Sequence, residues 1–569
     1  MSKNYDYLII GSGPAGVQMA YFLQQSQSNY VVVEKSAHVA SFFRVFPRCR
    51  ELISYNKVHS IFDDPEIILR WDWNSLLTND YSFPFRNFSQ RLYPHADELV
   101  NYLESFTEAY NLNICYNTKI IQVKRQKEGG FEVSDDQGVI YRCRVLIIAT
   151  GFSKPYIPDI SGIDLTENYE DISLENQTFT GQRVLILGKG NSAFEIADIA
   201  IETAAQVHIA SPNSLTLAWQ SRHPGHVRAN HTRLLDTYQL KLLNGTLDCH
   251  VKKITKAADG TFVVTVSYVH ADGEVEDLVY DRIVRCTGFS FKTEIYAPES
   301  QPECILNGRL PAITPYWEST NVSDLFFAGT LMQGRDFKKS SSAFIDGFRY
   351  NIRSLYRYLK QRYENIPLGK QKLAANPSEM RKAILTRACR TSGLWTQFGY
   401  LCDVFIVNKN HQVSWYEELP VQALHEGQFS SEEHYYSLTF EWGKWDGDVM
   451  AIERHPQADT AYTNVFLHPI LRRYSYGELI SEHHILEDLF GVYSADGEKG
   501  SVLKRSGRSI KQYHREEHEI PLETYLKKQF DSSIEESVDL ALSLYHVSLN
   551  DHNKKFREQG IGSKGKFEK

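Results

Sequence analysis

The sequence predicts an α/β protein made of two nested Rossmann-like units, followed by a C-terminal α+β domain. Three observations predict this class. The first is that a strand, a glycine turn and a helix follow one another twice, and the second is that two further strands end in Thr-Gly-Phe. The third observation is the length of 569 residues, which exceeds what two nucleotide-binding units need. A further domain must therefore follow them.

The first unit opens with an apolar run, residues 5–10, which predicts a strand. A glycine turn and a helical stretch to Gln25 follow. In this pattern Gly11 makes the turn, Gly13 lets the backbone approach a pyrophosphate, and Gly16 lets the helix pack closely on the strand. The start of the helix offers free N–H groups and a positive dipole to the phosphates.

The next predicted strand, residues 30–33, ends at Glu34, 23 residues after Gly11. A carboxylate at this position can accept hydrogen bonds from ribose hydroxyls. The alternative is a merely structural glycine turn, which would not require the strand, the helix and the acid together. We therefore predict a dinucleotide site formed by Gly11, Gly13, Pro14, Ala15, Gly16, Glu34 and Lys35.

The same glycine turn and helix recur after the predicted strand 183–187. The turn runs from Gly188 through Gly190 to Ala193, which stands where the third glycine stood. The following strand ends at Ser211, in the place that Glu34 holds in the first unit. A second nucleotide site is predicted at Gly188, Gly190, Asn191, Ser192, Ala193 and Ser211.

The missing acid at Ser211 favours NADPH over NADH, because a carboxylate there would repel a 2′-phosphate. Arg222 and Arg228 follow nearby and are predicted to bind that phosphate. The alternative is that both are ordinary surface charges.

Three further strands complete the predicted core, and each closes on glycine. Residues 145–152 and 283–289 end in Thr-Gly-Phe, and residues 324–330 end in Ala-Gly-Thr. After Arg335, a helix is predicted to begin among residues 340–342. We assign to cofactor binding Thr150, Gly151, Gly288, Gly329 and Ser341.

This nested arrangement resembles the two-dinucleotide-binding-domain flavoproteins, which include flavin-containing monooxygenases and pyridine nucleotide-disulfide reductases. The reductases are disfavoured because the sequence has no redox C-x-x-C pair. Several stretches, including 42–48, 52–57, 72–77, 235–241 and 466–469, are more closely similar to the FAD-dependent oxidoreductase domain-containing flavoproteins of the endoplasmic reticulum. The resemblance covers most of the chain and implies FAD in the first unit and NADPH in the second.

Two departures limit what the resemblance implies. We expect neither a signal peptide nor an endoplasmic reticulum retention tail, and therefore a cytoplasmic protein without the relatives' role in degradation. Residues 161–169 also contain no histidine, although Baeyer-Villiger and flavin-containing monooxygenases carry an F-x-G-x-x-x-H element before the second glycine turn. Oxygenation is therefore indicated by class and not by that motif.

The resemblance implies hydride transfer from NADPH to FAD, followed by reoxidation with O2. We expect a single-component monooxygenase acting on a small amine, amino acid or aromatic substrate. A flavin-dependent halogenase is an alternative. A second alternative is a redox-sensing flavoprotein that binds a protein partner through its C-terminal domain.

Four polar residues after the first unit are placed near the flavin by the resemblance and by their position. Asn56, Lys57 and Arg48 are the predicted catalytic residues, and Arg44 is predicted to bind the cofactor. Asn56 and Lys57 follow residues 52–54, which are predicted to form a short strand. Salt bridges within a loop are an equally weighted alternative for these side chains. The predicted helix start near Ser341 would stabilise negative charge on the reduced flavin.

Composition and charge exclude several other functions. The chain has 62 basic and 70 acidic residues, so no chain-wide positive field favours nucleic acid. No apolar run approaches the roughly 20 residues of a membrane span. Residues 514–518 fit an H-x-x-E-H zinc motif, but they lie in a charged stretch, which we interpret as a solvated helix face, so no metal site is predicted.

The chain divides into three domains and a tail. Proline and glycine in residues 365–370 predict a linker before an aromatic-rich region. This region is predicted to contain a short strand at 404–407 and a helix at 534–549, and it could cover the flavin, bind a partner or form a homodimer. The predicted parts are the FAD-binding domain (1–152 and 287–363), the NADPH-binding domain (153–286), the C-terminal α+β domain (371–553) and a basic disordered tail (554–569).

Overall fold

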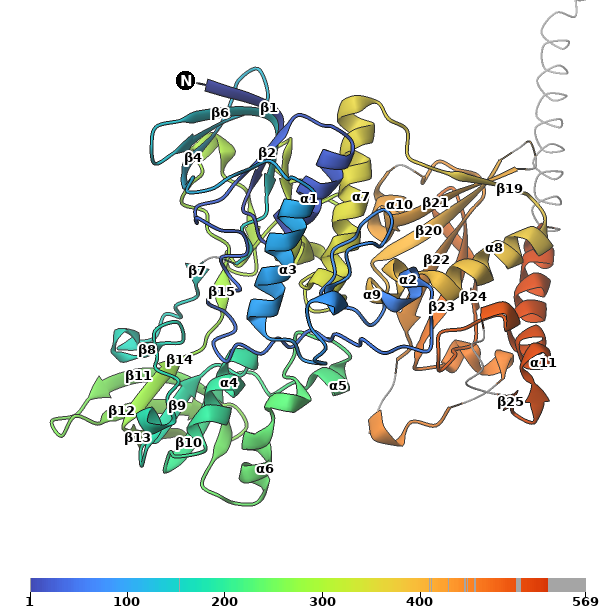
Figure 1. Ribbon diagram of the computed structural model, residues 1–569. Helices are drawn as coiled ribbons and strands as arrows, with labels where there is room; N and C mark the ends of the chain where they lie inside the picture. Colours follow the sequence, from blue (N-terminus) through green and yellow to red (C-terminus); the bar gives the residue numbers. More distant parts are fainter. Residues whose placement is uncertain are drawn as a thin grey trace, which may run out of the picture.

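The computed structural model describes residues 2–530, apart from 153, 409, 411, 428, 445, 446, 448, 455, 456 and 498–502. Figure 1 shows three lobes, one for each sheet of six or seven strands. The predicted helix 534–549 and the predicted tail lie outside the described residues. Among the helices that are described, none combines the length and the apolar character that a membrane span requires.

The first sheet has the order β3-β2-β1-β6-β5-β4, with β18 beside β6. Its β1, β2, β3, β6 and β18 run parallel, as a Rossmann-like unit requires. Helix α1 packs against α3 and α7. The bounds are β1 Ser2–Ile10, α1 Pro14–Gln25, β2 Tyr30–Val33, α3 Ala96–Ala109, β3 Ile114–Cys115, β4 Ile120–Arg125, β5 Phe131–Asp135, β6 Ile140–Ile148, β18 Leu325–Phe327 and α7 Ile345–Glu364.

The second sheet has the order β13-β12-β11-β10-β9-β14-β8. Its strands β11, β10, β9, β14 and β8 pair in parallel, and β12 and β13 continue as an antiparallel ribbon. The bounds are β8 Glu167–Asn168, β9 Arg183–Leu187, α4 Asn191–Ala200, β10 Gln206–Ser211, α5 Ala218–Ser221, α6 Arg233–Gln239, β11 Gly245–Lys256, β12 Phe262–Tyr268, β13 Val275–Tyr280 and β14 Arg282–Arg285. A short pair, β7 (Lys154–Pro155) with β15 (Phe289–Ser290), joins this unit to the first.

The third sheet is antiparallel throughout, in the order β19-β21-β20-β22-β23-β24. The predicted strand 404–407 is the middle of β20. The bounds are β19 Gln371–Ala374, α8 Pro377–Arg390, α9 Gly393–Thr396, β20 Leu401–Asn408, β21 Gln412–Pro420, α10 Val421–Glu426, β22 Tyr435–Trp442, β23 Leu467–Ser475, β24 Glu478–His484, β25 Lys504–Arg505, β26 Arg508–Ser509 and α11 Ile510–His514. Two mixed sheets with parallel, Rossmann-like cores and a separate antiparallel sheet confirm the predicted fold class.

The first and third sheets share one hydrophobic core. A continuous cluster of buried side chains runs from Val32 in β2 through Tyr350 in α7 to Phe440 in β22. The two faces of the second sheet instead carry their own clusters, around Phe194 and Tyr280. The C-terminal region therefore extends the first unit, while the second unit has a core of its own.

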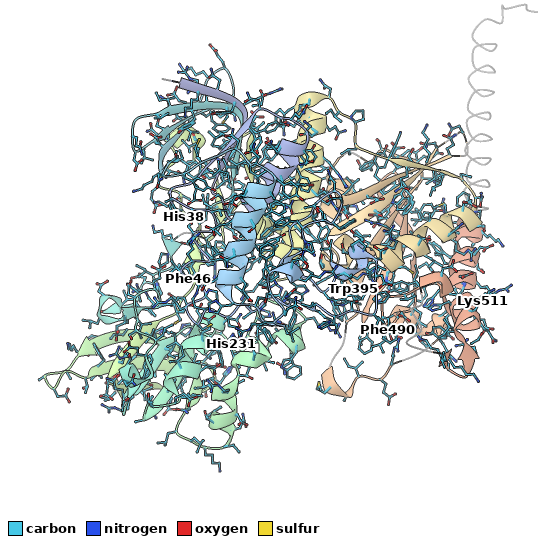
Figure 2. All side chains as sticks on the ribbon, in the orientation of Figure 1. His38, Phe46, His231, Trp395, Phe490 and Lys511 are labelled. Atoms are coloured by element: carbon cyan, nitrogen blue, oxygen red, sulfur yellow. The ribbon has the colours of Figure 1, made fainter. Side chains whose placement is uncertain are left out.

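Two buried arginines lie at the seam between the first unit and the C-terminal region. Arg70 donates hydrogen bonds to the carbonyl oxygens of Ala388, Thr391 and Gly491, at 2.8, 2.9 and 3.1 Å. Its guanidinium also lies 4.6 Å from the ring centroid of Trp395, which Figure 2 labels where the right-hand lobe meets the others. A buried charge is costly unless such partners compensate for the lost water.

Arg349 has the same role from α7. It is fully buried and donates to the carbonyl oxygens of Leu69, Asp72 and Ser75. The two guanidiniums thus fix the segment 69–75 and join it to both α7 and α8.

Two predicted details were wrong. Residues 52–54 form no strand, since only isolated bridges, Glu51 with His95 and Asn56 with Asp72, flank them. The helix predicted to begin among residues 340–342 begins instead at Ile345, because a 3-10 helix, Gly329–Arg335, and a buried turn precede it.

Replacing Arg70 with methionine should strongly destabilise the seam. The change leaves three buried carbonyl oxygens without donors, at a cost of about 3 kcal/mol or more in the free energy of unfolding. Urea denaturation followed by tryptophan fluorescence measures the loss. As a control, Arg142→Met removes a surface pair with Glu132 and should change stability by less than about 1 kcal/mol. Equal shifts for both variants would contradict the role of Arg70.

Candidate functional site

The first glycine turn has the geometry that a pyrophosphate requires. Gly11 has a φ of +104°, and a Cβ there would lie 2.7 Å from the carbonyl oxygen of Ala149. A Cβ at Gly16 would lie 1.9 Å from the oxygen of Gly11, whereas a Cβ at Gly13 would meet nothing within 4 Å. No side chain caps the start of α1, so its N–H groups point into the open space beside Gly13.

Glu34 is buried at the end of β2 and holds the turn. Its Oε2 accepts hydrogen bonds from the backbone N–H and the hydroxyl of Ser12, at 2.8 and 3.0 Å. Its Oε1 accepts from the N–H of Ser36 at 3.0 Å. The carboxylate therefore lies against the glycine turn, where a ribose would be bound, while the adjacent Lys35 is exposed.

Two loops from other strands meet beside the same turn: the loop after β6, which contains Gly151, and the loop after β18, which contains Gly329. Gly329 has a φ of +74°, and a Cβ there would lie 2.7 Å from the Cβ of Ala15. A Cβ at Gly151, which follows Thr150, would lie 3.4 Å from Oγ1 of Thr330. That Oγ1 is buried and has no hydrogen-bond partner among the described residues. An orphaned hydroxyl beside an open, uncapped helix start fits a bound dinucleotide.

The second turn repeats this geometry. Gly188 has a φ of +118°, and a Cβ there would lie 2.2 Å from the carbonyl oxygen of Cys286. Gly190 again has open space, Ala193 is fully buried, and no side chain caps α4. A cavity of about 20 Å³ adjoins this turn and is lined in part by Ser192 and Gly288.

The surroundings of Ser211 include a lysine and an acid that sequence reasoning missed. Nζ of Lys189 donates to the carbonyl oxygen of Ser211 at 3.3 Å and also contacts the carboxylate of Asp248. Asp248 is the register partner of Ser211 on β11. Hydrogen bonds from Lys189, Ser214 and His270 overcome partial burial and lower the pKa of Asp248.

Arg222 and Arg228 do not face Ser211. The guanidinium of Arg222 donates to the carbonyl oxygens of Gly443 and Val465 and lies over the ring of Trp442. Arg228 is buried and donates to the carbonyl oxygen of Ile53 at 2.7 Å. The structure thus corrects the predicted phosphate contacts, since both arginines join the second unit to its neighbours. Distance along the chain could not show this.

Asn56 and Lys57 have different environments. The side-chain amide of Asn56 donates to the carbonyl oxygens of Ser89 and Arg91, at 2.8 and 3.2 Å, while its Oδ1 is buried without a partner among the described residues. Oδ1 of Asn56 is therefore available to a bound cofactor. Lys57 is exposed, and its side chain makes no hydrogen bond or ion pair with another described residue that would place it in a site.

Arg48 and Arg44 make structural contacts. Arg48 donates a hydrogen bond to the carbonyl oxygen of Ile172 at 2.9 Å, and this contact links the first unit to the second unit. Arg44 pairs with Glu104 of α3. For Arg44 the structure supports the alternative of a loop salt bridge.

A buried acid at this junction escaped sequence reasoning. Glu195, in the first part of α4, accepts a hydrogen bond from the Tyr169 hydroxyl at 2.7 Å. Burial raises the pKa of Glu195. Burial also raises the pKa of Cys49 to about 12, and the Cys49 thiol contacts the same carboxyl group. Phe46 stacks on Tyr169 nearby, and Figure 2 labels Phe46 between the two left-hand lobes. The signal was an acid set between two apolar residues, Phe194 and Ile196, in the first part of α4.

Ser341 lies in the buried turn before α7 and not at the start of the helix. A Cβ added to Gly347 would lie only 2.1 Å from the carbonyl oxygen of Ser341. Asp346, in the first turn of α7, is buried, and this burial raises its pKa to about 7. Oδ1 of Asp346 has no hydrogen-bond partner among the described residues.

The H-x-x-E-H segment was wrongly interpreted as wholly solvated. His514 and His518 are buried, with their Nδ1 atoms 2.9 Å apart, while Lys511 and Arg515 cover the exposed face. Burial lowers the pKa of His514 to about 4, so it is neutral at pH 7. The described part of the chain holds no group of three or more side chains arranged to bind a metal.

Two matching glycine cradles, one nested inside the other, define a flavoprotein with two dinucleotide-binding domains. Residues 8–329, more than half of the chain, match the model of the pyridine nucleotide-disulphide oxidoreductase family. The chain belongs to this family.

Curated relatives extend the likeness over most of the chain. FAD-dependent oxidoreductase domain-containing protein 2 of Danio rerio is 34% identical over 523 residues, which cover 83% of this chain and 76% of that protein. The protein of the same name from Mus musculus is 33% identical over 548 residues, with 86% and 81% covered. The 2-oxo-Delta(3)-4,5,5-trimethylcyclopentenylacetyl-CoA monooxygenase of Pseudomonas putida is 27% identical over 233 residues, 38% of this chain and 40% of that protein.

The predicted resemblance is thereby confirmed, and the chain is a flavin-dependent oxidoreductase. FAD and a nicotinamide dinucleotide are its cofactors. The residues present fit them, because both turns leave the space and the free N–H groups that phosphates need.

Alanine at the two open glycines should separate the two sites. Because a Cβ at Gly13 or Gly190 meets no protein atom, both variants should fold with unchanged melting temperatures. Gly13→Ala should lose at least about tenfold in FAD affinity, since the methyl group occupies the space for the pyrophosphate. Gly190→Ala should keep its FAD and weaken only the nicotinamide dinucleotide. Flavin absorbance and nucleotide titration measure both, and unchanged affinities would contradict the assignment.

Proposed function

We propose that this protein is an NADPH-dependent, single-component flavin monooxygenase that oxygenates a small amine, amino acid or aromatic substrate with O2. The observation that carries the proposal is the second cradle, whose turn keeps the geometry of the first. A protein that used flavin only as a structural element would not need the second cradle. The relative from Pseudomonas putida, named as a monooxygenase, supports the choice of reaction.

The chain's own residues would orient the cofactors and hold protons. FAD, when bound, would take a hydride from NADPH and pass the electrons to O2. Oδ1 of Asn56 and Oγ1 of Thr330 are buried and unpaired, so they can hydrogen bond to a bound cofactor. Asp346, with a pKa raised to about 7 by burial, can hold or release a proton at Oδ1 near neutral pH.

Anaerobic reduction followed by reoxidation tests the reaction. NADPH should bleach the flavin absorbance of the purified protein. On admission of O2, a productive substrate should raise NADPH consumption without an equal yield of H2O2. Absence of bleaching would overturn the proposal, and H2O2 equal to NADPH with every amine, amino acid and aromatic tested would indicate a simple oxidase.

The same experiment separates the two alternatives. A halogenase would form product only with added halide. A redox-sensing protein that binds a partner would reduce slowly with NADPH, with no small molecule changing the rate. The intact second cradle favours the enzyme over this partner-binding alternative.

The preference for NADPH is part of the proposal and rests on Ser211. Its hydroxyl lies at the end of β10, with the ammonium of Lys189 bonded to its carbonyl oxygen. Three donors engage the nearby Asp248 carboxylate, which limits its repulsion of a 2′-phosphate.

Ser211→Glu should therefore raise the KM for NADPH at least tenfold, since the new carboxylate repels the 2′-phosphate, and leave the KM for NADH nearly unchanged. Steady-state kinetics with both nucleotides measure this effect. Arg222→Gln is the matched control and should not alter the NADPH to NADH ratio, because its guanidinium binds Gly443 and Val465. A shift with Arg222→Gln alone would contradict the assignment to Ser211.

A further inference from the structure

A cavity of about 500 Å³ lies where the first unit meets the C-terminal region. Helix α7, helix α8 and strands β19 and β21 line it, and no residue of either glycine turn does. Its volume falls within the roughly 300–1,000 Å³ of small-molecule sites. The nucleotide cradles do not account for it.

Three arginines that line the cavity surround one fully buried carboxylate, that of Glu418, which does not itself line it. Arg353 takes both oxygens of Glu418, with Nε donating at 2.8 Å. Arg387 pairs with the second buried carboxylate, Asp403, at 2.8 Å. Arg357 is left 3.7 Å from Glu418, with a hydrogen bond to the carbonyl oxygen of Glu417 at 3.2 Å. Burial accordingly lowers the pKa of Arg357.

Two carboxylates that do line the cavity are already engaged. Glu66 accepts from the N–H and hydroxyl of Ser392 and from the hydroxyl of Tyr81. Glu417 accepts from Gln371 at 2.6 Å and lies 3.4 Å from Arg387. Arg357 is therefore a lining cation whose charge is only partly compensated, at 3.7 Å from Glu418.

The rim and the walls complete a site for an anion with an apolar body. Lys382, exposed on α8, has no salt bridge to any described residue, and it lines the cavity. Trp415, Leu373 and Ala383 provide an apolar wall. Glu379, also exposed at the rim, disfavours a second negative charge on the ligand.

We propose that this cavity binds a small organic monocarboxylate, with its carboxylate on Arg357 and Lys382 and its apolar part against Trp415 and Leu373. Both cations line the cavity, and they would bind the carboxylate through charge-assisted hydrogen bonds. The site is separate from the flavin chemistry proposed above and does not depend on it.

Fluorine NMR with 4-fluorobenzoate tests the site on the full-length, FAD-loaded protein without NADPH. The wild-type protein should broaden the signal of 4-fluorobenzoate and not that of the neutral 4-fluorobenzamide. Arg357→Gln and Lys382→Gln should each weaken binding by about tenfold or more, and Arg357→Lys should retain part of it.

Lys372→Gln is the matched control. Lys372 is an exposed lysine between Gln371 and Leu373, so its side chain points to the opposite side of β19. It should bind 4-fluorobenzoate like the wild type, and all variants should keep their flavin absorbance and melting temperature. No broadening at millimolar 4-fluorobenzoate, equal binding of the amide, or an equal loss with Lys372→Gln would overturn the proposal.

Discussion

The burial of two guanidiniums with only neutral partners is the constraint on which the seam depends. Arg349 and Arg70 need six carbonyl oxygens between them, and these come from segment 69–75, from α8 and its end, and from Gly491. Asp72, whose carbonyl binds Arg349, also bridges the backbone of Asn56. The position of a candidate cofactor contact is thus set by an arginine on a distant helix.

The shared core makes the first unit and the C-terminal region one packed body, whereas the second unit keeps its own two cores. The second unit is joined by the short β7–β15 pair and by side chains such as Arg48, Arg222 and Arg228. Units joined by small polar contacts move relative to one another more readily than units that share a core. Rearrangement during nucleotide exchange is therefore expected between the second unit and the rest.

The sequence was sufficient to predict the elements that local chemistry dictates. The turns at Gly11 and Gly188 need positive φ and close backbone approach, which restricts those positions to glycine whatever surrounds them. The contacts of Arg222 and Arg228 could not be predicted, because a long side chain reaches partners that depend on how three units pack. The same holds for Arg70 and Arg349, which the pattern of apolar residues does not distinguish from surface charges. The burial of His514 and His518 likewise depends on which helix face packs against segments distant in sequence, where Leu486 and Tyr493 contact His518.

The two cradles differ at the end of the strand that follows each glycine turn. In the first, Glu34 binds the turn through Ser12 and presents a fixed carboxylate, which suits ribose hydroxyls and excludes a phosphate. In the second cradle, Ser211 stands at the end of the corresponding strand, and the nearby acid is Asp248 on the neighbouring strand. Lys189 neutralises the carboxylate of Asp248. Lys189 stands between two glycines, so its backbone shapes the turn while its ammonium sets the charge at Ser211. One residue thereby couples the site for the pyrophosphate to the site that distinguishes the nucleotides.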